Sequence, residues 1–339
     1  MRKIITASLL ILAGFMSLYF REPEEFKRQG TAMDTIISMT VYDNDKVLDE
    51  AFALLHELDN RLSMYNPSSD VSTINAKSGK SKVTVSHHTV QTVRDSLRLY
   101  EITGGVFNPL IGAVTKLWKI NKSEGKLPSP ESLDQAVKLS KVYNIVISVD
   151  NVFLKEKGCV LDLGGIAKGY ASTEIAKLIK SRGVKSAIID LGGNVHTVGK
   201  KIDGSLWQIG IRNPLNPFGA PALAVKVADS AVITSGNYER FKTIDGKKYS
   251  HFFDPKTGRS VMSDLLSVTV ISPDGSLADG LATAFMITGI DKAVEILRNI
   301  PDSPGVVFIT HDKITATSNL RDKVIPTKFS IPLTFVEVP

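Results

Sequence analysis

The chain has 339 residues, of which 43% are hydrophobic and 22% charged, enough to bury the core of one large domain or of two closely joined ones. Its single cysteine, Cys159, excludes a disulfide framework and any zinc or iron–sulfur site that needs several cysteines. The formal net charge of +6 is spread along the chain without a basic run. This balance predicts mild attraction for anionic ligands and argues against nucleic acid as a partner.

The N-terminus differs in composition from the rest of the chain. Two basic residues precede an uncharged segment, Ile4–Phe20, which as a helix would span about 25 Å, slightly short of the ~30 Å hydrocarbon core of a membrane. We therefore expect residues 1–20 to form an export signal or anchor and residues 21–339 to form the globular domain. No clear Ala-x-Ala cleavage site follows, and Phe15 stands where a lipoprotein carries its lipidated cysteine, so an uncleaved anchor is favoured. Basic residues before the apolar segment predict a domain on the extracytoplasmic side of the cell membrane.

Three amphipathic helices are predicted in the N-terminal half. Lys46–Leu62 carries an apolar stripe, and Asp45 is placed to cap it. His87–Ile102 is the second helix and ends at a Gly-Gly pair. The third begins at Ser129 and Pro130, in the order expected for an N-cap and the first helical residue. The two histidines that begin the second helix are predicted to be solvated.

The region between residues 156 and 199 has the most regular pattern. It predicts a strand, a helix and another strand, at Cys159–Leu163, Ile166–Ser181 and Val184–Leu191. The letters Asp-Leu-Gly-Gly end both strands as a local repeat. Further strands are predicted at Leu206–Ile211, Leu223–Val227, Lys248–Phe253, Leu265–Ile271 and Val306–Thr310, and helices at Ala278–Gly289 and Asp291–Asn299. This irregular order indicates an α+β fold and not a doubly wound sheet.

The segment from Asp162 to Lys168 leads from the first of these strands through two glycines into a helix start. Free N–H groups at a helix start favour bound phosphate, and Lys168 lies in the first turn, where its ammonium could reach a phosphate oxygen. The spacing of the glycines fits neither a Rossmann nor a P-loop motif. A tight turn in which Asp162 caps the helix is an equally good interpretation of the same residues.

Asp279 and Thr283 are four residues apart, so a helix places them on one face. A carboxylate and a hydroxyl in this arrangement suit Mg²⁺, which prefers oxygen ligands and completes its shell with phosphate and water. The competing interpretation, which the residues by themselves favour, is a capping box in which Ser276 and Asp279 begin the helix.

A third segment, Tyr249–Arg259, carries a histidine out of a predicted strand into an Asp-Pro-Lys-Thr-Gly turn. His251 could accept a proton from a hydroxyl near neutral pH, and Lys256 or Arg259 could face phosphate. A lone histidine is more often only hydrogen-bonded in place, and the residues by themselves favour that structural role.

Six segments, in order and at matching spacings, together resemble the ApbE family of FAD:protein FMN transferases. They are Ala32–Thr35, Leu62–Asp70, Val106–Leu110 with Leu117 and Trp118, Asp162–Tyr170, His251–Gly258 and Ala278–Ala284. Each segment is weak alone, whereas all of them in register are hard to obtain by chance. The resemblance implies an α+β fold related to the T-fold, with a single catalytic unit of two closely joined subdomains.

In function, the resemblance implies an enzyme that binds FAD and Mg²⁺, cleaves the pyrophosphate, and attaches FMN through its phosphate to a Thr or Ser of an acceptor flavoprotein, releasing AMP. His251 matches the family's proposed base. The metal-coordinating positions are matched by the Gly165 carbonyl, Asp279 and Thr283. The positions that hold FAD are matched by Met33, Tyr65, Phe107, Asn108, Asp162, Lys168 and Phe253. Two residues depart from the common pattern, since Asn108 stands where many relatives have Asp and Asp34 where many have Gly.

Three alternatives use the same features differently. An FAD pyrophosphatase would let water replace the acceptor hydroxyl and would release free FMN with AMP. A membrane-tethered flavin-binding protein would hold FAD without turnover, although the intact Asp279, Thr283 and His251 argue against it. An extracytoplasmic interaction module would bind no nucleotide.

Overall fold

The computed structural model describes residues 23–120, 126–216, 218–327 and 331–338. The segment expected to be an export signal or anchor, residues 1–20, lies outside these described residues. Within the described ranges, no helix is both long enough and apolar enough to cross a bilayer. The division of the chain at residue 21 therefore stays a prediction.

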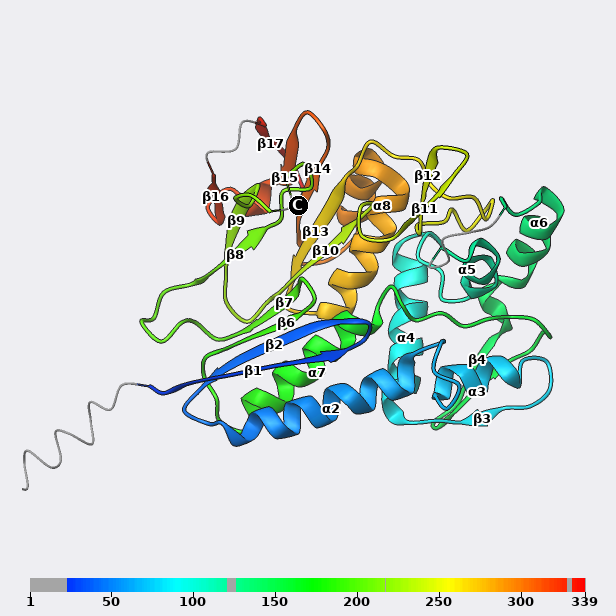
Figure 1. The fold of residues 1–339 in the computed structure, drawn as a ribbon, viewed down its shortest axis with the longest axis horizontal. Coiled ribbons are helices and arrows are strands. Elements are labelled where there is room, and N and C mark those ends of the chain that lie inside the picture. Colours follow the sequence, from blue (N-terminus) through cyan, green and yellow to red (C-terminus); the bar gives the residue numbers. More distant parts are fainter. Residues whose placement is uncertain (1–22, 121–125, 217, 328–330, 339) are drawn as a thin grey trace, which may run out of the picture.

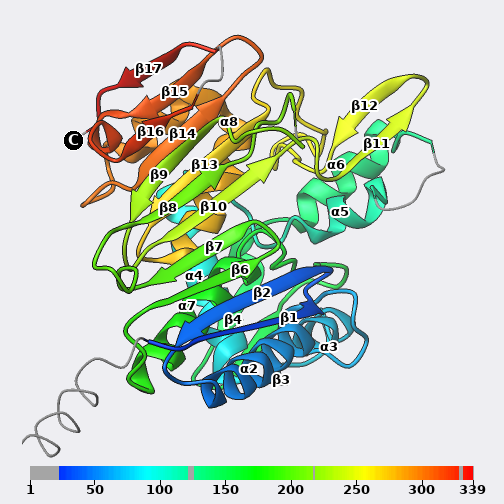
Figure 2. The ribbon, with the colours of Figure 1, turned by 60° about the vertical axis from the view of Figure 1, so that its left-hand side comes forward.

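A nine-stranded sheet forms the centre of the molecule (Figures 1 and 2). Its strands are Glu25–Ala32 (β1), Thr35–Tyr42 (β2), Ala187–Leu191 (β6), Asn194–Val198 (β7), Ala231–Gly236 (β10), Ser267–Ser272 (β13), Gly305–Ile309 (β14), Ile314–Thr317 (β15) and Leu333–Val336 (β17). Their order in the sheet is β1-β2-β6-β7-β10-β13-β14-β15-β17. Segments far apart in the sequence meet here, because β2 pairs with β6 and β7 pairs with β10.

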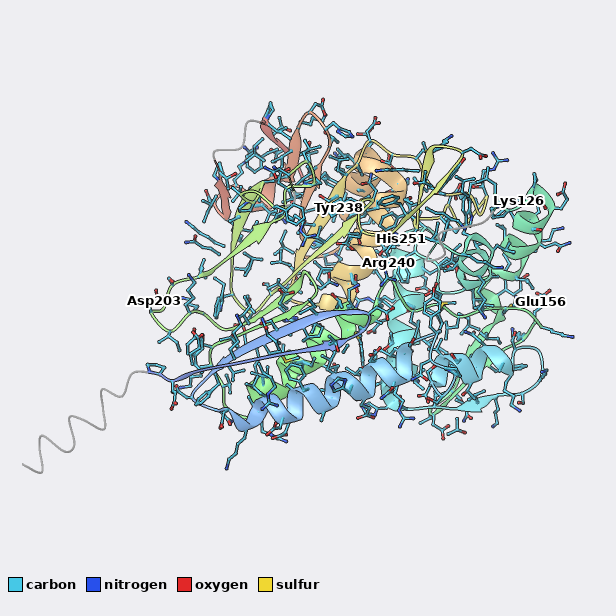
Figure 3. All side chains as sticks on the ribbon, viewed as in Figure 1. Lys126, Glu156, Asp203, Tyr238, Arg240 and His251 are labelled. Carbon is cyan, nitrogen blue, oxygen red and sulfur yellow. The ribbon has the colours of Figure 1, made fainter. Side chains whose placement is uncertain are left out.

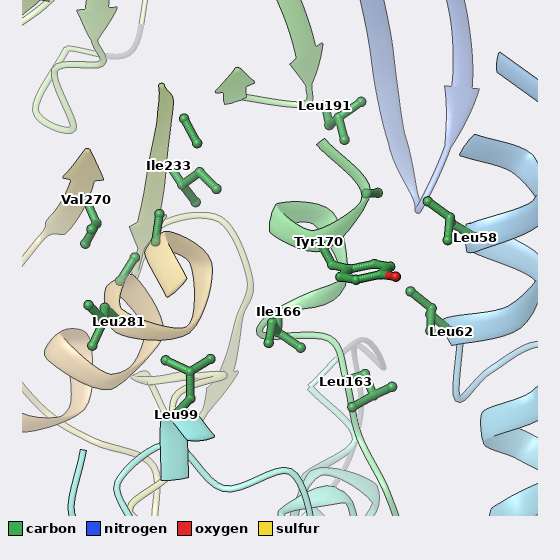
Figure 4. Close-up of a cluster of buried hydrophobic side chains, with 14 of the residues drawn as sticks. Leu58, Leu62, Leu99, Leu163, Ile166, Tyr170, Leu191, Ile233, Val270 and Leu281 are labelled. Carbon is green, nitrogen blue, oxygen red and sulfur yellow. The ribbon is translucent and has the colours of Figure 1, made fainter. Parts of the chain in front are cut away.

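Helices cover one face of this sheet (Figure 2). They are α2 (Lys46–Leu62), α4 (His87–Ile102), α7 (Ala167–Ser181) and α8 (Gly275–Leu297). Their apolar side chains meet Ile233, Val270 and other strand residues in the main core, which Figure 4 shows around Tyr170 and Leu281. The helices are therefore held to the sheet by apolar packing along one continuous core.

The opposite face of the sheet is covered by a second, three-stranded sheet of β8 (Trp207–Ile211), β9 (Leu223–Val227) and β16 (Val324–Pro326). Its apolar side chains form a separate core with residues of the large sheet. Because successive side chains of a strand point to opposite faces, Val232 belongs to this second core while its neighbour Ile233 belongs to the main one. The central strands are buried on both faces for that reason.

Smaller elements lie to one side of the large sheet (Figure 1). They are α3 (Asp70–Ala76), β3 (Val83–Thr84), α5 (Gly112–Trp118), α6 (Pro130–Leu139), the 3₁₀ turn η1 (Val142–Asn144), β4 (Ile145–Ile147), β5 (Asn151–Leu154), and the hairpin of β11 (Phe241–Ile244) with β12 (Lys247–Ser250). A second 3₁₀ turn, η2 (Ser318–Leu320), follows β15. Trp118 and Phe253 centre a third, small core that ties α5 and α6 to the segment after the hairpin.

The structure confirms the α+β fold class and the helices with a clear apolar stripe. Both Lys46–Leu62 and His87–Ile102 are helical over their whole predicted length, and α6 begins after an N-cap at Ser129. Asp45 occupies the predicted cap position of α2 but makes no side-chain capping hydrogen bond. The two helices predicted after residue 277 are the two parts of α8, which bends at Gly289, where φ is 76°.

The predicted strand at Cys159–Leu163 is wrong, because these residues have no strand partner. The side chain of Asn75 takes the place of a neighbouring strand: its Oδ1 accepts from the Leu161 N–H at 2.7 Å, and its Nδ2 donates to the Leu161 carbonyl at 2.9 Å. The prediction of solvated histidines at the start of α4 is wrong for His88, which is buried with its Nδ1 2.9 Å from the Tyr170 hydroxyl.

The first turns of α7 and α8 approach each other through two glycines. A Cβ atom added to Gly169 would lie 2.1 Å from the Gly275 carbonyl oxygen, and one added to Gly275 would lie 2.5 Å from that of Gly169. The Gly275 N–H also donates to the Thr173 hydroxyl at 2.9 Å. A larger residue at either position would force the two helix ends apart.

We expect Gly169→Ala to destabilise the fold by about 1–3 kcal/mol, the usual cost of overpacking, because its methyl group would meet backbone that cannot move aside. Urea unfolding of the purified protein measures this difference. Ser181→Ala, at an exposed position of the same helix, is the control and should change the free energy of unfolding by less than about 0.5 kcal/mol. Equal stabilities of the two variants would contradict the tight approach.

Candidate active site

A cavity of about 1180 Å³ lies where β6 and β10 end and α7 begins. Small-molecule sites usually have volumes of roughly 300–1,000 Å³, so this one has room for a large ligand. The residues that match the family's base, metal and FAD positions all line it, namely Met33, Tyr65, Phe107, Asn108, Asp162, Gly165, Lys168, His251, Phe253, Asp279 and Thr283. The fold thus gathers them at one place, and their individual roles stay predictions.

The Asp162 side chain organises the turn that precedes α7. One carboxylate oxygen accepts from the Gly164 N–H at 2.9 Å, and the other accepts from the Thr115 hydroxyl at 3.0 Å. The N-cap of α7 is Ile166, which has no side-chain capping bond. The interpretation of Asp162 as a helix cap is therefore wrong. The turn it stabilises brings the backbone of Gly164 and Gly165 to the cavity.

Asp279 is a buried carboxylate that reaches from α8 to the first turn of α7. It accepts a hydrogen bond from the Gly169 N–H at 2.9 Å. Burial raises the pKa of Asp279, and the charge of the nearby Lys168 ammonium opposes that shift. The capping box of Ser276 and Asp279 is wrong, because the N-cap of α8 is Asp274. Asp279 is thus free of any capping duty in its own helix.

The three predicted metal ligands adjoin one another. Asp279 and Thr283 lie one turn apart in α8. A Cβ atom added to Gly165 would lie 3.3 Å from the Thr283 Oγ1. Carbonyl, hydroxyl and carboxylate oxygens are the ligands that Mg²⁺ prefers. Among the residues that the structure describes, no three His, Cys, Asp or Glu side chains cluster in a way that could hold a metal. The donor set therefore suits a hard cation that keeps water or phosphate in its shell.

His251 lies at the foot of the β11–β12 hairpin, beside Arg240 (Figure 3). Its Nδ1 is 2.9 Å from the Arg240 carbonyl oxygen. Because a carbonyl can only accept, Nδ1 carries the proton in this bond and Nε2 is left as an acceptor. Burial lowers the pKa of His251 to about 4, and the charges of Arg240 and Lys168 act in the same direction. The ring is therefore neutral at pH 7, the state that a general base needs.

The turn after His251 is stabilised by Asp254, whose carboxylate accepts from the Lys256 N–H at 2.9 Å and from the Thr257 hydroxyl at 3.0 Å. Lys256 and Arg259 do not line this cavity but an adjoining hollow of about 410 Å³, so the expectation that either of them faces phosphate stays a prediction. The cations that line the main cavity come from other segments: Lys116, Lys119, Lys168, Arg212 and Arg240.

Three of the predicted ligand-contacting residues are aromatic. Tyr65 is 59% exposed, so its ring is open to a ligand, whereas Phe107 is buried in the wall. Phe253 stacks on Trp118, with ring centroids 5.6 Å apart and an angle of 24° between the planes. The exposed ring of Tyr65 offers a planar surface that suits a flat ring system such as a flavin or an adenine.

The two departures from the family pattern have local structural reasons. The Asn108 side chain accepts from the Leu110 N–H at 2.9 Å and donates to the Ser140 carbonyl at 2.8 Å, and an aspartate could make only the first of these bonds. Asp34 has a φ of 58°, in the left-handed region where glycine carries no penalty. Its carboxylate lies 3.8 Å from Arg240, so the added charge has a partner across the cavity.

Sequence analysis missed a second turn at the cavity, formed by Asp190, Gly192, Gly193 and Asn194. The Gly193 N–H donates to the Asp190 carboxylate at 2.7 Å. Asn194 is 3% exposed, and its side chain acts on the Asp279 carboxylate, where it opposes the rise of the Asp279 pKa. The repeated Asp-Leu-Gly-Gly letters were the available signal, because both copies end at this cavity. Arg212, which follows β8, had no comparable signal.

The sequence matches the ApbE family over residues 33–308. It is 32% identical over 321 residues to an FAD:protein FMN transferase of Treponema pallidum, covering 88% of this chain and 89% of the relative. A protein of the same name from Klebsiella pneumoniae is 31% identical over 304 residues, covering 89% of this chain and 94% of the relative.

Solved structures of ApbE proteins are similar to this chain in fold. The flavin transferase ApbE from Vibrio cholerae has a TM-score of 0.79 at 25% identity and covers 89% of this chain and 99% of its own. The apo form of the flavinyl transferase ApbE from Pseudomonas stutzeri has a TM-score of 0.80 at 26% identity, with coverages of 90% and 98%. Because most of its length matches the family, in sequence and in fold, this chain belongs to the ApbE family.

Proposed function

We propose that this ApbE-family enzyme is an FAD:protein FMN transferase. It would cleave FAD, join FMN through its phosphate to a Thr or Ser of an acceptor protein, and release AMP. The observation that carries the proposal is one large cavity lined by a neutral histidine, an oxygen-donor set and several cations. The names of the T. pallidum and K. pneumoniae relatives support the same assignment.

In this mechanism, the hydroxyl oxygen of the acceptor forms a bond to the phosphorus of the FMN half, and the bond from that phosphorus to the bridging oxygen breaks. AMP leaves with the bridging oxygen. His251 Nε2 takes the hydroxyl proton as the new bond forms, while Arg240 holds the ring through Nδ1. Lys168, in the first turn of α7, would bind the phosphate oxygens and stabilise the charge that develops on them.

Mg²⁺ fits the oxygen donors of Gly165, Asp279 and Thr283, and we propose that these residues hold it. When bound, it would neutralise charge on the pyrophosphate as a Lewis acid. Support comes from Asp279, whose pKa is raised by burial, so that a nearby cation would stabilise its ionised form. The Lys168 ammonium offsets only part of the effect of burial on the Asp279 pKa.

We further propose that residues 1–20 tether the enzyme to the cell membrane with its domain on the extracytoplasmic side, where the acceptor protein would also lie. The support is the uncharged segment Ile4–Phe20 with basic residues before it.

For the reaction, we expect His251→Ala to lower flavin transfer by about 10²–10⁴-fold, the usual contribution of a positioned base, with little change in FAD affinity. The wild-type rate should be level at neutral pH and fall only as the pH drops toward the His251 pKa of about 4, because the base acts in its neutral form. The full-length chain is incubated with FAD, Mg²⁺ and membrane proteins of the source organism. In-gel flavin fluorescence after denaturation and AMP release are followed together, per folded, FAD-bound molecule.

His56→Ala, at an exposed position of α2, is the control for this comparison and should behave as the wild type. Release of AMP without any fluorescent protein band would identify an FAD pyrophosphatase instead. FAD binding without either product would identify a flavin-binding protein. Near-normal transfer by the His251 variant would remove that residue from the mechanism.

For the metal, we expect Asp279→Asn to raise the melting temperature of the metal-free protein, because it removes a buried charge yet still accepts from the Gly169 N–H. Mg²⁺ should stabilise the wild type and not the variant, which should also lose turnover. Calorimetry in EDTA and in Mg²⁺ measures both effects. Asp134→Asn, at an exposed position of α6, should keep the wild-type response. Full activity of the Asp279 variant in EDTA would reject the metal site.

For the membrane topology, a reporter that is active only outside the cytoplasm is fused after Pro339. We expect it to be active and to sediment with membranes, because positive charge before the apolar segment retains the N-terminus in the cytoplasm. The control fusion lacks residues 1–20 and should stay in the cytoplasm. Activity of a cytoplasmic reporter on the complete chain would refute this orientation, and release into the medium would show cleavage.

A further inference from the structure

The β11–β12 hairpin belongs to neither of the sheets that build the body of the protein. It pairs Phe241 with Ser250 at its open end and closes in a turn at Asp245 and Gly246, both with positive φ. Figure 2 shows it extending above α5 and α6, away from the nine-stranded sheet. Because the hairpin pairs with neither sheet, packing of the main core does not account for its position.

The foot of the hairpin is part of the cavity. Arg240 immediately precedes β11 and His251 immediately follows β12, and both line the cavity. A hydrogen bond joins the two residues, because the Arg240 carbonyl oxygen accepts from the His251 Nδ1 at 2.9 Å. One ring contact anchors the hairpin to α5, between Tyr249 and Trp118, whose centroids are 5.4 Å apart. The hairpin and α5 together therefore form a rim beside His251.

This rim is basic. Lys247 and Lys248 on the hairpin are exposed. Lys116 in α5 and Lys119, the C-cap of that helix, are exposed as well. Within the described part of the chain, none of these four lysines forms an ion pair with a carboxylate. Their positive charge is therefore available to a partner from outside the molecule.

The basic rim also carries apolar surface. Phe241 is 40% exposed and Leu117 is 36% exposed. The Lys248 ammonium lies over the Phe241 ring at 4.6 Å, so one cation and one aromatic ring form a single patch. Cations mixed with exposed apolar side chains suit a polypeptide segment, which can contact both. Lys247 and Lys248 do not line the cavity, so a nucleotide inside the cavity does not account for them.

We infer that this rim, defined by Lys116, Lys119, Phe241, Lys247 and Lys248, is the docking surface for an acidic segment of the acceptor protein next to its target Thr or Ser. The inference rests on the proposed transferase function and deepens it by naming the chemistry of the acceptor. A hydroxyl has to reach His251 Nε2 at the foot of the hairpin, and the chain that carries it must pass this rim. Acidic side chains on that chain would meet the unpaired lysines.

The test uses two rhodamine-labelled peptides, each with one central Thr, flanked by Asp and Glu in one peptide and by Asn and Gln in the other. Binding to the full-length, FAD-loaded chain in EDTA is measured by fluorescence anisotropy. We expect the acidic peptide to bind at least about ten-fold more tightly, and the preference to disappear in Lys247→Glu/Lys248→Glu and at high salt. The affinity for FAD should stay within about two-fold of the wild type, because neither lysine lines the cavity.

The matched control is Lys80→Glu/Lys82→Glu, the same charge change at two exposed residues before β3 that do not line the cavity. It should keep the preference of the wild type. Equal binding of the two peptides to the wild type, or an unchanged preference in the hairpin variant, would overturn the inference. Binding to anionic phosphatidylglycerol vesicles that the hairpin variant loses, without a peptide preference, would also overturn it by assigning the rim to the membrane.

Because binding is measured without turnover, this test does not depend on flavin transfer. A wild type that prefers the acidic peptide but never labels a protein would reject the proposed function and not the docking surface. A wild type that labels proteins but shows no peptide preference would reject the docking surface and not the proposed function.

Discussion

The buried hydrogen bond from the Gly169 N–H to the Asp279 carboxylate, 2.9 Å long, is the interaction on which the rest of the site depends. It exists only because Gly169 and Gly275 let the first turns of α7 and α8 approach within backbone contact. A buried carboxylate is costly by itself, and the positive end of α7 and Lys168 reduce that cost. The same approach brings Gly165, at the turn before α7, beside Thr283 on α8.

The part of the site that holds the proposed base, His251, is positioned differently. His251 does not sit on the large sheet or its helices but at the end of a hairpin that stands apart from both. Its ring is held by one backbone carbonyl, and it is kept neutral by burial and by the positive charges of Arg240 and Lys168. Cations that would attract a pyrophosphate therefore also keep the base unprotonated, so that one arrangement of charge serves both requirements.

Sequence patterns predicted the elements whose stability is local. The apolar stripes of α2 and α4 repeat at helical spacing, so both helices were found over their full length. Predictions failed where a distant group supplied the partner. Cys159–Leu163 has the apolar character of a strand, yet the Asn75 side chain satisfies its backbone. Likewise, Asp279 has the spacing of a cap but bonds to another helix, because Asp274 already caps its own.

By itself, the sequence determined the α+β class, the amphipathic helices and, through the resemblance of six ordered segments, eleven of the residues that line the cavity. It did so because periodic burial and motif order are properties of neighbouring residues. Only the tertiary structure decided which atoms meet: Asp279 with Gly169, 110 residues apart, or both Asp-Leu-Gly-Gly turns at one cavity. It also decided that the His251 ring uses Nδ1 for the Arg240 carbonyl, which leaves Nε2 as the acceptor, and that Lys256 lines a second hollow. These outcomes depend on how sheets, helices and hairpin pack together, and no local pattern of residue types encodes contacts over such separations.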